Sequence, residues 1–160
     1  MGTTTLYYLI DDFRIHLGDY TEPYSYSDTV VLQVLNMACK YLKKKWGNRY
    51  TIDSAGLVSR NSLVTFNDAE PPVIEVADEV AFILQASIIL KSADIRNSIW
   101  DIGSWRDDEI SFSNIASSNA YERSLMHDID ALKYFLEHRL FAGSKQSLPG
   151  FRAGINYYEG

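Results

Sequence analysis

Few residues of this chain have the types and spacing that an enzyme or metal site requires. Asp12 and His16 are one helical turn apart in a predicted helix and could form a pair. Two ligands do not make a zinc site, so we expect a surface ion pair, with an unrecognised acid-base pair as the alternative. His127 and His138 are separated by about 16 Å along another predicted helix and cannot share one metal ion.

Cys39 is the sole cysteine, which excludes an internal disulfide and fits a reducing compartment. Lys40 and Lys43 are close to it on the same predicted helix and could lower its pKa. Its position on or beside an apolar stripe instead favours a small buried hydrophobic residue. The acidic run 107–109 could bind a hard cation, but it lacks the regular oxygen spacing of a calcium loop.

The common catalytic and cofactor motifs are absent from the sequence. It contains no glycine-rich phosphate loop, no Gly-x-Ser-x-Gly, no Cys-x-x-Cys and no His-Glu-x-x-His. We therefore expect a protein that is not an enzyme and that binds neither a cofactor nor a metal.

Composition predicts one globular domain. The chain has 160 residues, of which 46% are hydrophobic and 22% charged. Its net charge of −6 argues against gripping nucleic acid, although an acidic protein can line a path along which DNA slides. The basic cluster of Lys43 to Lys45 with Arg49 is interpreted as a solvated helix end rather than a phosphate site.

The sequence also predicts that the protein is not inserted in a membrane. Its longest apolar window, residues 80–90, is broken by Gln85 and Ser87 and is too short to span a bilayer. No basic segment precedes an apolar stretch at the N-terminus, so we expect no signal peptide and synthesis in the cytoplasm.

The segment from Ser27 to Trp46 has the clearest helical signals. Ser27 or Asp28 can cap its first turn, the basic run suits its C-terminus, and Gly47 follows as a terminator. Its apolar stripe is Val31, Leu35, Ala38 and Leu42, widened by Val34 and Tyr41.

A shorter helix is predicted before this segment, from about Thr4 to His16, with Gly18 as its end. The tyrosine-rich linker 19–26 is expected to clamp the two helices together. After Gly47 the helical period vanishes, and Tyr50–Ile52 and Leu63–Phe66 are predicted to form a loose β-hairpin.

A long third helix is predicted over about residues 72–98. Its core stripe is expected to be Ala77, Val80, Ala81, Leu84, Ile88 and Ile95. The opposite stripe of Asp78, Phe82, Gln85, Ile89, Ser92 and Arg96 should be polar on a monomer, yet it carries Phe82 and Ile89. These two residues are therefore a candidate subunit interface, with a central position in the bundle as the alternative.

Residues 100–114 look irregular, with a possible short strand at 109–112. Asn119 and Glu122 form a plausible capping box for a fourth helix that ends at Gly143. The last segment, 143–160, has no period but is unusually apolar for a solvated tail, which suits an arm that orders on a partner. The candidate binding residues of this arm are Leu148, Phe151, Arg152, Ile155, Tyr157 and Tyr158.

The predicted fold is therefore mainly α. It is a small bundle of about four helices over residues 1–142, with a short β-hairpin or extended loop at about 48–70 and an extended C-terminal arm at 143–160.

The order of these elements resembles the head-tail connector, or adaptor, proteins of tailed bacteriophages. The features that match are a short first helix, Gly18-Asp19 with a tyrosine- and serine-bearing linker, and Ser27-Asp28 opening the helix SDTVVLQVLNMACKYL. A long third helix, a serine-rich segment over residues 111–118, a final helix near Tyr121 and a C-terminal arm follow in the same order. The loop 47–71 and the arm themselves do not align with the family.

The resemblance implies a structural virion protein of the neck, made in the host cytoplasm. It further implies that the subunits assemble as a ring, expected to be a dodecamer, beneath the portal protein. The ring extends the DNA channel without binding DNA specifically and docks the stopper or tail-completion protein. The arm is then a candidate for gripping the portal, and Phe82 with Ile89 a candidate contact within the ring.

A second interpretation comes from a different class of protein. The chain could be a small helical regulatory or scaffolding protein that binds one partner through its C-terminal arm and forms no ring.

Overall fold

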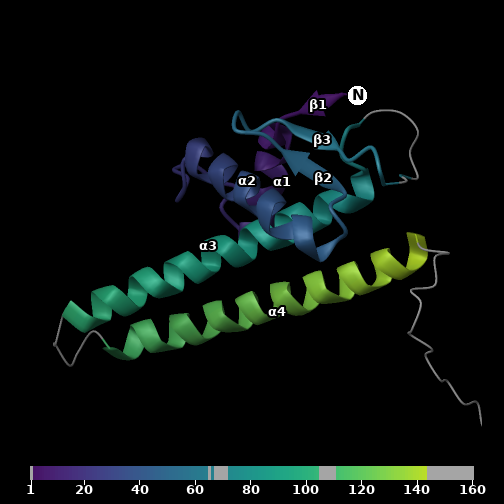
Figure 1. Ribbon diagram of the computed structural model, residues 1–160. Helices are drawn as coiled ribbons and strands as arrows, with labels where there is room; N and C mark the ends of the chain where they lie inside the picture. Colours follow the sequence, from purple (N-terminus) through teal and green to yellow (C-terminus); the bar gives the residue numbers. More distant parts are fainter. Residues whose placement is uncertain (1, 65, 67–71, 105–110, 144–160) are drawn as a thin grey trace, which may run out of the picture.

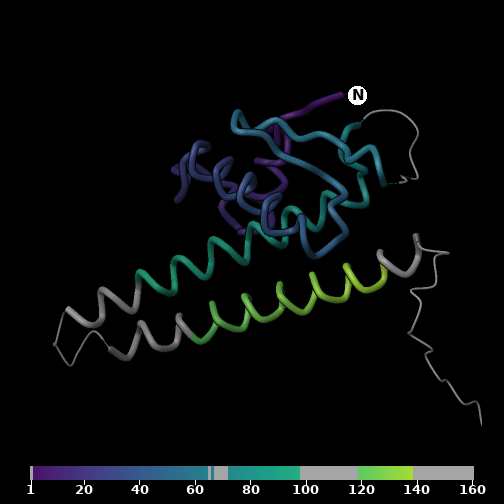
Figure 2. Tube along the Cα trace, in the orientation of Figure 1, coloured from purple at the N-terminus to yellow at the C-terminus, as the bar shows by residue number. Residues whose placement is uncertain are grey.

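The computed structural model describes residues 2–64, 66, 72–104 and 111–143, with the backbone alone at residues 98–104, 111–118 and 139–143. Two long helices, α3 (Val76–Ser104) and α4 (Ser111–Gly143), run antiparallel as a hairpin. The shorter elements gather over the first half of α3, so the far end of the hairpin projects beyond them (Figures 1 and 2). The fold is mainly helical with a small sheet, which confirms the predicted class.

The chain begins with β1 (Thr3–Thr4), the 3-10 helix η1 (Leu6–Leu9) and α1 (Ile10–Leu17). The predicted start of the first helix at Thr4 is wrong, because Thr3 and Thr4 pair with another strand instead. The predicted end is confirmed at Gly18, whose φ of 77° is the left-handed conformation that glycine adopts without strain.

Helix α2 (Asp28–Lys45) agrees closely with the predicted segment. The Ser27 side chain accepts a hydrogen bond from the Val30 amide, which satisfies a free donor of the first turn. The four residues of the main predicted stripe are buried, but Tyr41 is 57% exposed and does not widen it.

The second predicted strand is displaced. β2 (Tyr50–Ile52) is confirmed, but its partner is β3 (Val58–Arg60), not Leu63–Phe66, and Leu63 is 92% exposed. The Asp53 carboxylate accepts hydrogen bonds from the amides of Ala55 and Leu57, which fixes a tight turn directly after β2. The sheet is antiparallel with the order β1-β3-β2, so it also includes a strand from the N-terminus.

The predicted core stripe of α3 is rotated. Ala81 and Leu84 are buried as expected, but Ala77 and Val80 are exposed. Asp78 and Gln85, from the stripe expected to be polar and outward, are buried instead. The reason is that α2 and β2 supply partners for these polar side chains, as described below.

Helix α4 starts earlier than predicted. Its first residue is Ser111, so the predicted strand at 109–112 is wrong at its last two residues, while 109 and 110 lie outside the described ranges. Asn119 is inside the helix and caps nothing. A capping signal contributes only about 1 kcal/mol, and contacts along α3 can outweigh it. The predicted end at Gly143 is confirmed.

Candidate functional site

The structure contradicts a subunit interface at Phe82. This side chain is fully buried within the chain, with its ring centroid 5.3 Å from that of Trp46 and 5.7 Å from that of Tyr50. Edge-to-face and tilted packing of this kind stabilises the core of a single subunit. Ile89 is half-buried and packs against the same core. The predicted alternative, a central position of α3 in its bundle, accounts for both residues.

The predicted arm lies outside the described residues, and so does the acidic run 107–109. The arm residues Leu148, Phe151, Arg152, Ile155, Tyr157 and Tyr158 therefore remain a prediction. Helix α4 ends at Gly143, directly before this segment.

The predicted basic cluster divides into two parts. Lys43, Lys44 and Lys45 are exposed at the end of α2, and Lys45 donates a hydrogen bond of 2.9 Å to Gln85 of α3. Arg49 instead binds acidic residues of α3, so it is not available to join a phosphate site with the lysines.

The acidic partners of Arg49 are Glu75 and Asp78, which are buried at the start of α3. The guanidinium lies 3.0 Å from a carboxylate oxygen of each residue. The Tyr50 hydroxyl donates a hydrogen bond of 2.6 Å to Asp78 and accepts one from the Glu75 amide. Buried carboxylates need such partners, and this cluster joins β2 to α3.

Cys39 is 1% exposed in the core, as predicted for a small buried hydrophobic residue. Burial raises the pKa of its thiol to about 12 and outweighs the charges of Lys40 and Lys43, which act in the opposite direction. The alternative of a reactive thiolate is therefore wrong.

The predicted pair of Asp12 with His16 does not form among the described ion pairs. His16 instead lies 3.3 Å from Asp128 of α4, measured between Nε2 and Oδ1. His127 and His138 are exposed on α4, and the ring of His138 stacks on Tyr134 with centroids 3.8 Å apart. No histidine of the described residues belongs to a group that could hold a metal ion.

A row of polar side chains joins α3 to α4 along the hairpin. We call it the polar seam, and its members are Ser87, Lys91 and Asp94 of α3 with Tyr121, Ser124 and Asp128 of α4. The α3 members are spaced four and three residues apart, which places them on one face of the helix. Each donates to or accepts from the α4 residue that faces it across the antiparallel pair.

Asp128 is the centre of the seam and is 2% exposed. It accepts hydrogen bonds of 2.6 Å from the Ser87 hydroxyl and 2.6 Å from the Lys91 ammonium, which also donates to Ser124. Burial alone would raise the pKa of the Asp128 carboxyl, but the bonds from Lys91 and Ser87, with the charges of Lys91 and His16, lower it. The carboxylate is therefore ionised and fully engaged at neutral pH.

The seam continues at Asp94. The Tyr121 hydroxyl donates a hydrogen bond of 2.7 Å to Asp94, and Tyr26 donates to the same oxygen. Burial, followed by the bond to Asp94, raises the pKa of Tyr26 to about 12. Tyr26 belongs to the linker between α1 and α2, so this carboxylate ties the linker to the hairpin, whereas the prediction expected the linker to clamp α1 to α2.

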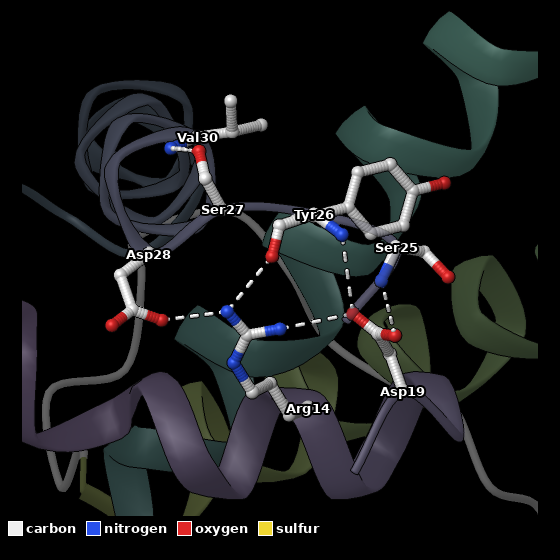
Figure 3. Close-up of polar contacts among 7 residues, drawn as sticks. All are labelled: Arg14, Asp19, Ser25, Tyr26, Ser27, Asp28 and Val30. Carbon is white, nitrogen blue, oxygen red and sulfur yellow. Dashed lines mark hydrogen bonds and ion pairs between the residues drawn. The ribbon is translucent and has the colours of Figure 1, made fainter. Parts of the chain in front are cut away.

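That predicted clamp exists, but it is formed mainly by Arg14. Its guanidinium donates hydrogen bonds to the carboxylates of Asp19 and Asp28 and to the Tyr26 carbonyl, at 2.9, 2.6 and 2.8 Å (Figure 3). It also lies 4.0 Å from the centroid of the Tyr24 ring. One buried arginine thereby connects α1, the linker and the start of α2.

The residue types of the seam could in principle perform chemistry. Asp128 is in contact with a serine, a lysine and a histidine: Ser87, Lys91 and His16. Such groups serve as nucleophiles and bases in hydrolases. Ser87 and Lys91 are, however, 0% and 5% exposed and bonded to Asp128. A substrate cannot reach them without separation of α3 from α4, so we interpret the seam as a structural connection.

Metal sites, membrane-spanning helices and related proteins were also sought. The described residues contain no group of three or more histidine, cysteine, aspartate or glutamate side chains that could hold a metal ion. None of the helices, as far as they are described, is long and apolar enough to cross a membrane. Comparison with known proteins finds no matching family, no similar curated protein and no similar solved structure.

The sequence analysis missed the polar seam, although a signal for it exists. Ser87, Lys91 and Asp94 lie within or directly after the apolar window 80–90, at a spacing that places them together on one face. Ser124 and Asp128 are one turn apart in the next helix. Two polar faces of this kind on consecutive helices predict a buried contact between them, but the prediction used only Ser87, as a break in an apolar window.

Proposed function

We propose that this protein is a structural virion protein, a head-tail connector (adaptor) subunit. In this proposal it forms a ring beneath the portal, extends the DNA channel and docks the stopper or tail. The resemblance in the order of elements supports the assignment, as does the mainly helical fold with its long third helix.

The observation that carries the proposal is the position of two exposed apolar surfaces. A closed ring of identical subunits needs two different patches on each subunit. On α2, Val30, Met37 and Tyr41 are 38%, 41% and 57% exposed. Figure 1 shows α3 between this helix and α4, so a surface on each of the two helices can lie on different sides of the subunit.

The second surface is the outer side of α4. Met126 and Tyr134 are 55% and 64% exposed there, while Leu132 and Leu136 are buried toward the bundle. The α2 surface carries the exposed lysines Lys40 and Lys44. The α4 surface carries the exposed acids Glu122, Asp130 and Glu137 together with Arg123 and Lys133. These two surfaces replace Phe82 as the proposed contact between neighbouring subunits, and we expect the lysines to lie near the acids across it.

The burial of Phe82 favours the second candidate function. Because the apolar side chain of Phe82 is already buried within one subunit, association through α3 would bury little additional apolar surface. A small helical regulatory or scaffolding protein that binds one partner through its C-terminal segment is consistent with this observation.

Native mass spectrometry of the full chain, alone and mixed with purified portal rings, distinguishes the two. The connector proposal predicts a ring, or one copy of the chain bound for each portal subunit. Met37→Glu with Tyr41→Glu should abolish that assembly, because it places charge in the apolar contact. The control is Tyr20→Glu, at a linker residue that is 63% exposed. A chain that stays monomeric and forms no complex with the portal rings would contradict the connector proposal.

A further inference from the structure

An exposed surface beyond the polar seam, toward the start of α3, combines apolar and acidic side chains from α3, α1 and η1. We call it the acidic-apolar face. Its apolar members are Val76 and Val80 of α3, 64% and 48% exposed, with Ile15 of α1 and Tyr8 of η1, 65% and 45% exposed. Its acids are Asp12 of α1 and Glu79 of α3.

Glu79 shares a hydrogen bond with Tyr8, and Tyr8 precedes Asp12 by four residues in the chain. Neither of the two acids forms an ion pair among the described residues, in contrast to Asp19, Glu75, Asp78 and Asp128, which all do. Burial and the negative charge of Asp12 raise the pKa of Glu79, while its hydrogen bond with Tyr8 acts in the opposite direction. Two like charges beside exposed apolar side chains form a surface that a cationic, apolar segment would complement.

The C-terminal segment, residues 144–160, has that chemistry. It contains the cations Lys145 and Arg152, and Leu148, Phe151 and Ile155 alternate with them along the chain. The acidic residue of this segment is Glu159, near its end.

Helix α4, which precedes this segment in the sequence, ends near the acidic-apolar face. The seam pairs Ser87 with Asp128 and Asp94 with Tyr121, so α4 runs toward the beginning of α3 as it approaches Gly143. Figure 1 shows the end of α4 next to the first turns of α3, where Val76 and Val80 lie. Residues 144–160 can extend for roughly 50 Å, which is enough to cross the first turns of α3 and reach α1.

We infer that residues 144–160 bind to the acidic-apolar face of their own chain. Lys145 and Arg152 approach Glu79 and Asp12, while Leu148, Phe151 and Ile155 cover Val76, Val80 and Ile15. The contact lies within one chain and goes beyond the proposed function, because it requires neither a ring nor a portal. If the segment also grips a portal, that grip competes with this contact.

Disulfide trapping in the full-length chain tests the inference. Val80→Cys with Ile155→Cys, in a Cys39→Ala background, should form an intramolecular disulfide under mild oxidation. The matched control is Tyr41→Cys with Ile155→Cys, since Tyr41 is similarly exposed on α2. The elevated local concentration of a docked segment should give about tenfold faster trapping than the control pair.

Charge reversal provides the second arm of the experiment. Asp12→Lys with Glu79→Lys, added to the Val80 and Ile155 pair, should slow trapping about tenfold through the loss of two ion pairs. If Cys39→Ala impairs folding, the same pairs with Cys39 retained serve instead, because that thiol is buried.

Three results would overturn the inference. They are equal trapping rates for the test and control pairs, a disulfide that joins two chains instead of closing one, and trapping that does not respond to charge reversal. A disulfide between chains would indicate that the segment is exchanged with a second copy. Each result is obtained without a portal, so it is independent of the proposed connector function.

Discussion

Asp128 is held by side chains from two other helices, Ser87 and Lys91 of α3 and His16 of α1. At the scale of single residues, the fold depends on a few buried charged side chains such as Asp128, each held by hydrogen bonds and ion pairs. Removal of one partner from such a group leaves an uncompensated charge in the core, which costs more than the bond itself.

Lys91→Met should therefore lower the free energy of unfolding by about 3 kcal/mol, because Asp128 loses its cation in a buried setting. Urea denaturation measures this change. The matched control is Lys133→Met at an exposed position of α4, where a change within about 0.5 kcal/mol is expected. Equal effects of the two substitutions would mean that the buried pair does not stabilise the hairpin.

The lowered pKa of Asp128 also predicts a dependence of stability on pH. A group whose folded pKa lies below its unfolded value of about 3.9 contributes fully above that value and loses its contribution as the pH falls through the folded pKa. Unfolding free energies measured from pH 6 downward should thus fall in acid. The fall should be smaller in Asp128→Asn. An identical acid dependence in the variant would assign the effect to other carboxylates.

Cys39 should resist alkylation in the native protein, because burial raises the pKa of its thiol to about 12. Iodoacetamide at pH 8, followed by intact mass measurement, should label the chain only after addition of denaturant. Rapid labelling without denaturant would contradict the position of this residue in the core.

At the scale of elements, the sequence predicts α2 well because its cap, apolar stripe and terminator are local signals. The displaced strand and the early start of α4 could not be predicted in this way. β3 pairs with Thr3 and Thr4 from the N-terminus, and α4 is stabilised by contacts with α3 across the hairpin. These are contacts between distant parts of the chain, and they outweigh local propensity.

The same limit applies to the candidate sites. The apolar stripe of α3 was assigned to the wrong side, since hydrophobicity alone does not reveal that Arg49 and Tyr50 would satisfy Asp78. Cys39 was predicted correctly, because its position on a strong helical stripe determines its burial.

Tyr121→Phe should loosen the pairing of α4 with α3 without unfolding the shorter elements. It removes a hydroxyl donor to Asp94, and a lost bond to a charged group costs about 1.5–3 kcal/mol. Hydrogen exchange should accelerate in residues 119–125 of α4 and stay unchanged in α2. Tyr134→Phe, at a position 64% exposed on the same helix, is the control. Unchanged exchange at residues 119–125 would contradict a stabilising role for the seam.

At the scale of the whole molecule, the C-terminal segment connects both proposals. Replacement of Phe151, Tyr157 and Tyr158 with serine should leave the unfolding free energy of the helical part within about 1 kcal/mol, and should abolish attachment to portal rings. Pull-down with purified portal measures attachment, and circular dichroism monitors the fold. Undiminished attachment would show that these three side chains do not bind the portal, and would contradict the proposed role of the segment.

We propose that this chain is a neck component of a tailed virus. The most direct test is its copy number, by quantitative mass spectrometry against the portal protein, in purified virus particles produced from the genome that encodes it. The proposal predicts a ratio near one copy for each portal subunit, as a stacked ring requires. Absence of the protein from the particles would contradict the connector function and leave a helical partner-binding protein as the better interpretation.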